Sequence, residues 1–151
     1  MCKPWQKSVL LGLAAWLCLA VPVAGAGDIL ITVTGVRNSN GNILACLWFE
    51  GWGFPDCDAF GAKTRQTAVK AEAGSVTFMF TDVPDGKYAV SVAHDQNGDG
   101  KLDRHQFFGY PVEGAGVSNF IDAPRFVPFH HDALFEASGA ETSIVIPLHY
   151  P

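Results

Sequence analysis

The chain has 151 residues, of which 48% are hydrophobic and 17% are charged, and its 15 acidic side chains outnumber 10 basic ones. This composition is that of a globular protein and excludes a disordered or low-complexity chain. The acidic balance also argues against nucleic acid as a partner, because surfaces that bind phosphate backbones are basic.

The first 26 residues have the pattern of a secretory signal peptide. Lys3 and Lys7 precede an apolar run over residues 8–21, and Ala24-Gly25-Ala26 supplies the small residues of a cleavage site. The apolar run is shorter than the roughly 20 residues that cross a bilayer. We therefore expect a secreted or periplasmic protein with no membrane span in the mature chain, residues 27–151. Cleavage removes two of the 10 basic residues and none of the 15 acidic ones, which leaves a net charge of −7.

Two of the four cysteines, Cys2 and Cys18, lie within the expected signal peptide. The mature chain keeps Cys46 and Cys57, in a compartment where disulfides persist. We expect these two cysteines to form a disulfide; the alternative is a buried Cys46 on a strand and an unpaired Cys57.

Short apolar segments with period-two alternation recur along the mature chain, separated by Gly, Pro, Asn and Asp, and no long segment has helical periodicity. The expected strands cover residues 29–36, 43–50, 67–72, 75–81, 88–93, 133–137 and 143–150. About seven short strands in one domain favour an all-β fold, an antiparallel β-sandwich of the immunoglobulin or transthyretin type. A small barrel is the second choice.

The turn residues predict how the expected strands are connected. The cluster 38–41 predicts a hairpin between the first two strands, and Pro84-Asp85-Gly86 predicts a turn. Residues 51–65 and 109–128 are expected to be two long irregular loops, the first with a helical turn near residues 59–63. The fifth strand, apolar on both faces, is expected to be central, and Pro147 places the last strand at a sheet edge.

The stretch HDQNGDGKLDRHQFFG, residues 94–109, has a carboxylate or amide at every second position and then a glycine. If Asp95 is position 1 of a calcium loop, the glycine of position 6 is Gly100, and we expect the shell to lie within residues 95–106. The expected ligands are Asp95, Asn97, Asp99, the Lys101 carbonyl, Asp103 and Gln106.

Position 12 departs from the calcium pattern, because Gln106 stands where a bidentate glutamate is usual. Glu113 or Asp122 from another loop could complete the shell. The alternative is an ordinary polar turn, since Asn-Gly and Asp-Gly are common turn dipeptides. That alternative leaves Asp95 and Asp103 without compensation for their charges. We therefore expect calcium as a structural cofactor, bound weakly.

The same region carries a resemblance to a bacterial secreted family, domain of unknown function 2141. That family's pattern is a GxYA strand, an HDxNxNGxxD loop, an FGxPxEGxGxSN segment and a PxFxxA strand. The residues that match it here are Gly86, Tyr88, Ala89, His94, Asp95, Asn97, Gly100, Asp103, Gly109, Pro111, Glu113, Gly114, Gly116, Ser118 and Asn119. The chain departs from the pattern at Asp99, often asparagine in the family, and in its longer PRFVPFHH segment.

The resemblance implies a secreted β-sandwich and brings no established activity. We expect a non-enzymatic binding or envelope-interaction module whose partner is a protein or glycan of the cell envelope. No GxSxG motif is present for a nucleophilic serine. A hydrolase using two loop carboxylates is the second alternative. The GxGxxN run at 114–119 lacks the βαβ setting of a dinucleotide site.

The first alternative is a carbohydrate-binding module that uses loop aromatics, with Trp52, Phe108 and Tyr110 as the expected ligand contacts. Such rings also commonly fill the ends of a sandwich core. A transition-metal site at 130–132 (His-His-Asp) is disfavoured, because neighbouring residues on a strand point to opposite faces. We expect His94 to donate a hydrogen bond that orders the adjoining loops.

Overall fold

The computed structural model describes residues 25–122 and 128–151. All but the last two residues of the expected signal peptide lie outside this part of the chain. The elements are β1 (Ala26–Val36), β2 (Asn42–Trp48), β3 (Thr64–Lys70), β4 (Gly74–Pro84), β5 (Gly86–Asp95), β6 (Gly114–Val117), α1 (His130–Ala133), β7 (Phe135–Ala137) and β8 (Glu141–Pro147).

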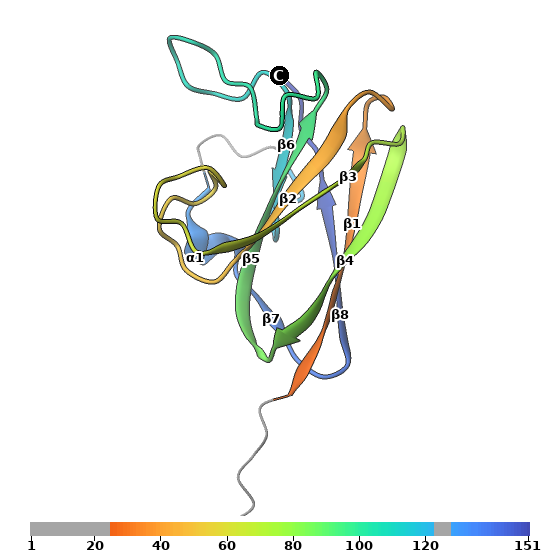
Figure 1. The fold of residues 1–151 in the computed structure, drawn as a ribbon, viewed down its shortest axis with the longest axis vertical. Helices are drawn as coiled ribbons and strands as arrows, with labels where there is room; N and C mark the ends of the chain where they lie inside the picture. Colours follow the sequence, from red (N-terminus) through yellow and green to blue (C-terminus); the bar gives the residue numbers. More distant parts are fainter. Residues whose placement is uncertain (1–24, 123–127) are drawn as a thin grey trace, which may run out of the picture.

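The strands form two sheets that face each other, which confirms the all-β sandwich (Figure 1). One sheet has the order β4-β1-β8, and the other has the order β3-β2-β5-β6, with β7 also paired to β5. The position of β5 in the middle of its sheet and of β8 at an edge confirms both predictions. The pairing of β1 with β8 is parallel, so the sandwich is not purely antiparallel.

The predicted hairpin between the first two strands is wrong. β1 pairs with β4 and β8, whereas β2 pairs with β3 and β5, so the turn at residues 38–41 carries the chain from one sheet to the other. The reason lies in the apolar faces. Ile29 and Ile31 of β1 and Ile43 and Leu47 of β2 are fully buried in the same core. Two strands with such faces bury more apolar surface by packing across the core than by lying side by side.

Three further expectations about the loops need correction. Residues 53–62 form successive turns in which the backbone N–H of Asp56, Ala59 and Ala62 bonds to the carbonyl three residues earlier, and they contain no helix. The region 109–128, expected to be irregular, contains β6. The expected strand 133–137 is divided between the end of α1 and β7.

The glycines of β6 explain why this strand was missed. A Cβ on Gly116 would overlap the carbonyl oxygen of Pro147, at the end of β8. A short bridge between Ala115 and His149, through two backbone hydrogen bonds of 2.9 Å, holds β6 against the C-terminal segment. A strand built for close backbone approach has small residues, and its sequence therefore lacks the apolar alternation that identifies strands.

The five-stranded sheet is covered on its outer face as well. A second apolar cluster of Trp48, Ala89, Val117 and Ala133 lies there, with Phe54 packed against it. This cluster is covered by α1 and by the loop that joins β2 to β3, both of which lie away from β1, β4 and β8 (Figure 1). Trp48, at the end of β2, is fully buried, but Trp52, Phe107, Phe108 and Tyr110 are exposed, so the expectation that most of these aromatics fill the core is wrong.

Candidate functional site

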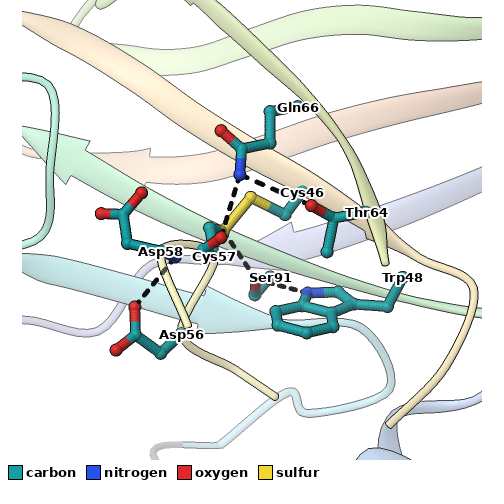
Figure 2. The surroundings of a disulfide bond; sticks show 8 residues. All are labelled: Cys46, Trp48, Asp56, Cys57, Asp58, Thr64, Gln66 and Ser91. Carbon is teal, nitrogen blue, oxygen red and sulfur yellow. Dashed lines mark hydrogen bonds between the residues drawn. A yellow bond between two sulfur atoms is a disulfide. The ribbon is translucent and has the colours of Figure 1, made fainter. Parts of the chain in front are cut away.

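The predicted disulfide is present and fixes the loop between β2 and β3 to the outer face of the sheet. Cys46 and Cys57 are bonded, with their Cα atoms 6.1 Å apart. Figure 2 shows the bond between two polar contacts: Ser91 accepts a hydrogen bond of 2.9 Å from Nε1 of Trp48, and Gln66 donates one of 2.9 Å to the carbonyl of Cys57. The loop is therefore held near its middle by a covalent link to β2 and by a hydrogen bond from β3.

The acidic loop after β5 curls around the carboxylate of Asp95, which is fully buried. Oδ1 of Asp95 accepts hydrogen bonds from the backbone N–H of Gly98 (2.8 Å) and Asp99 (3.1 Å), and Oδ2 accepts one from Gly100 (2.9 Å). Gly98 and Gly100 have φ values of 75° and 87°, the left-handed conformation that glycine allows. The charge of the Asp95 carboxylate is thus compensated by backbone N–H groups, which the polar-turn interpretation did not account for.

The other predicted calcium ligands join the same network. Nδ2 of Asn97 donates to Asp103 at 2.8 Å, and Oδ1 of Asn97 accepts from the backbone of Asp99 at 3.0 Å. Asp99 in turn accepts from the backbone of Lys101 at 3.1 Å. These hydrogen bonds link residues 95–103 into one local network, in which Asn97, Asp99 and Lys101 are exposed.

Glu113, proposed from sequence as a completing ligand, reaches this loop from the start of β6. It is 6% exposed, and its two oxygens accept hydrogen bonds from the backbone of Gln96 (2.8 Å) and Asp103 (3.1 Å). Gln106 and Asp122 make no hydrogen bond with the network in the part of the chain described. Within residues 25–122 and 128–151, no three His, Cys, Asp or Glu side chains are grouped so as to hold a metal ion. Calcium binding stays a prediction.

The histidines have separate roles. His94 is fully buried, and its Nε2 donates to the carbonyl of Asn40 at 2.8 Å while its Nδ1 lies 2.7 Å from the hydroxyl of Tyr150. This confirms that His94 donates a hydrogen bond that orders a loop. His130 lies in α1, not on a strand, with its ring 5.5 Å from that of Phe54, and His131 pairs with Asp132 at 3.2 Å.

A projecting segment, residues 104–111, follows the acidic loop at the end of the sandwich where the chain ends (Figure 1). A bridge between Arg104 and Pro111 closes its base, and the backbone of His105 donates to Tyr110 at 2.8 Å. The rings of Phe108 and Tyr110 lie nearly parallel, 11° apart, with centroids separated by 6.1 Å. Phe108 is 75% exposed and Tyr110 48%.

A cleft of two adjoining hollows lies on the outer face of the five-stranded sheet, between the disulfide loop and the projecting segment. The larger hollow has a volume of about 540 Å³, and the smaller about 350 Å³. The larger one is lined by Phe108, Tyr110, Val117, Glu113 and His149 among others. Five residues line both hollows: Pro55, Ser91, Val92, Leu102 and Arg104. We call these two hollows together the loop-end cleft.

The predicted ligand contacts fall into two groups. Phe108 and Tyr110 line the cleft, whereas Trp52 lines neither hollow and donates from Nε1 to the carbonyl of Phe60 at 2.9 Å. Sequence reasoning did not find Arg104 or His149. They come together only because β6 bridges to the C-terminal segment, and neither has a local motif that marks it. The serine and asparagine of the SN motif are structural: Ser118 and Asn119 bond to the carbonyls of Ala133 and Leu134.

The fold and this site define a class of protein: an all-β sandwich with a cleft formed by loops on the outer face of one sheet. The family model described as "uncharacterized protein conserved in bacteria" (DUF2141) matches residues 31–145, and the chain belongs to that family. No curated protein and no solved structure matched the chain. No helix in the described part of the chain is long and apolar enough to cross a membrane.

Proposed function

We propose that the protein is an exported, non-catalytic binding module whose ligand lies in the loop-end cleft. The cleft is the observation that carries the proposal. Its larger hollow is within the range of small-molecule sites, roughly 300–1,000 Å³. It combines an apolar floor at Val117 with two exposed rings, Phe108 and Tyr110, and a few polar groups, which is the usual composition of such sites.

The support for export is in the sequence, where basic residues, an apolar run and a small-residue cleavage site stand in order. The disulfide of Cys46 and Cys57 agrees with an oxidising compartment. The partner is a molecule of the cell envelope or of the surroundings of the cell.

The binding role is tested by NMR on the labelled protein, with a library of small ring-containing fragments as probes. We expect shifts clustered at cleft residues such as Leu102 and Val117, and a loss of affinity of about tenfold or more in Phe108→Ala and Tyr110→Ala. Phe107→Ala is the matched control, because Phe107 belongs to the same segment and is 81% exposed but does not line the cleft. The proposal falls if no fragment shifts the cleft signals, or if all three variants behave alike.

We also propose that the acidic loop binds calcium and that the ion stiffens the base of the projecting segment. The support is the oxygen spacing of Asp95, Asn97, Asp99, Lys101 and Asp103 and the hydrogen-bond network that links these residues in one short loop. Because both oxygens of Asp95 already accept backbone hydrogen bonds, binding is expected to be weak, with a Kd on the order of 10⁻⁴ to 10⁻³ M.

Calorimetry and thermal melting with calcium test this second proposal. We expect heat of binding and a higher melting temperature at millimolar calcium, with both effects lost in Asp103→Asn. Magnesium is the control ion, since it demands a stricter octahedral shell. Absence of heat together with an unchanged melting temperature at several millimolar calcium would show that the loop does not bind calcium.

A further inference from the structure

The shape of the loop-end cleft favours an elongated ligand. Its two hollows share five lining residues, so they adjoin one another along the sheet. Leu102 and Arg104 line both, and Arg104 therefore stands at the junction of the two hollows. A ligand that fills the cleft extends from the rings of the projecting segment toward the disulfide loop and passes the Arg104 side chain.

Arg104 has unused capacity for an anion. Within the described residues its side chain donates one hydrogen bond, from Nη1 to the carbonyl of Gly109 at 3.2 Å, although a guanidinium has five N–H donors. Among residues 25–122 and 128–151 it forms no ion pair, in a chain where acids outnumber bases by 15 to 10. The carboxylate that lines the larger hollow, Glu113, already accepts two backbone hydrogen bonds. A planar guanidinium with free donors is suited to bidentate binding of a carboxylate.

The larger hollow has the features that bind a sugar ring. The nearly parallel rings of Phe108 and Tyr110 line it, with His105 packed against both at centroid distances of 5.0 and 4.9 Å, and an exposed aromatic face stacks on the C–H side of a pyranose. His149 also lines this hollow.

We propose, on the basis of the binding function above, that the ligand is a linear acidic oligosaccharide of two or more rings. One ring stacks on Phe108 and Tyr110, and a uronic-acid carboxylate binds the guanidinium of Arg104 at the junction. A site for an acidic sugar differs from a site for a neutral sugar because its affinity depends on one charge pair. This dependence can be measured.

The probes are tetramers of galacturonic, glucuronic and mannuronic acid, each compared with its own methyl ester, which keeps the shape and removes the charge. Calorimetry on the exported protein should show at least one acid binding about tenfold or more tightly than its ester, with affinity falling as salt is raised. Arg104→Gln should abolish the preference for the acid, and Arg104→Lys should restore part of it. Tyr110→Ala should weaken acid and ester alike, and Phe107→Ala should change neither.

The proposal is overturned if none of the three acids binds at about 10 mM, or if Arg104→Gln leaves the preference unchanged. These results are separable from failure of the binding function. If ring fragments still shift the cleft signals while the acids do not bind, only the class of ligand is wrong. If neither fragments nor acids reach the cleft, both proposals are wrong.

Discussion

Asp95 accepts a hydrogen bond of 2.9 Å from the backbone N–H of Gly100 on one carboxylate oxygen, while its other oxygen accepts two more from the same loop. One fully buried carboxylate thus organises a whole surface loop. Hydrogen bonds to an ionised group are among the stronger ones in proteins, and losing the group leaves three backbone donors without a partner.

We therefore expect Asp95→Ala to lower the free energy of unfolding by about 2–4 kcal/mol. Asp99→Ala, in the exposed part of the same loop, should change it by less than about 1 kcal/mol. Urea unfolding in the presence of a calcium chelator measures both and keeps the ion out of the comparison. Equal losses in the two variants would show that the loop is not organised around Asp95.

Ser118 connects β5 to the end of α1. Its Oγ accepts a hydrogen bond of 2.9 Å from the backbone of Val90 and donates one of 2.6 Å to the carbonyl of Ala133. Ser118→Ala leaves both buried backbone groups unpaired, and we expect a loss of about 2–3 kcal/mol of unfolding free energy. Ser143→Ala on β8 is the control, because Ser143 is exposed. Similar stabilities for the two variants would contradict this role.

Alanine substitutions at Gly41 and Gly98 distinguish the cost of backbone strain from the cost of steric overlap. Both have positive φ, 64° and 75°. A Cβ at Gly41 would overlap the carbonyl oxygen of Asp95, whereas one at Gly98 would meet nothing within 4 Å. Gly98→Ala should cost only the left-handed strain, about 1–2 kcal/mol, and Gly41→Ala should cost clearly more. The midpoints of urea unfolding rank the two, and a Gly98→Ala protein as unstable as Gly41→Ala would refute the overlap.

His130 should make stability depend on pH. Burial of its ring, and secondarily the charge of His131, lower the pKa of His130 from its ordinary value. The folded protein therefore binds fewer protons than the unfolded chain between the lowered pKa and about 6.5. Stability should be full above that window and should fall as the pH drops through it.

The pH effect is measured as the change in melting temperature between pH 8 and pH 5. We expect His130→Gln to reduce the drop, because glutamine does not take up a proton, and His131→Gln to reduce it by a smaller amount. An unchanged drop in His130→Gln would assign the pH dependence to other groups.

Several features were accessible from sequence because they depend on neighbouring residues. The period-two alternation around Ile29 and Ile31 identified a strand with one buried face. The apolar run of β5 placed it in the interior of its sheet. Local rules of this kind hold because they describe geometry that one segment imposes on itself.

The partner of each strand could not be predicted in the same way. The turn at residues 38–41 has the residues of a hairpin, yet β1 and β2 belong to different sheets. The alternation in each strand specifies that one face is buried and leaves open which strand lies beside it. Pairing depends on how all the apolar faces are covered together, and in this protein β8 from the other end of the chain takes the place beside β1.

By itself the sequence determined the all-β class, the disulfide, the acidic loop and the family resemblance, since each of these depends on residue type and on short spacing. Only the tertiary structure decided that the carboxylates of Asp95 and Glu113 bind backbone N–H groups, and that Arg104 and His149 line one cleft. The physical reason for the cleft is that Arg104 and His149 are far apart in the chain. The packing of two sheets and the bridge between β6 and the C-terminal segment bring them together.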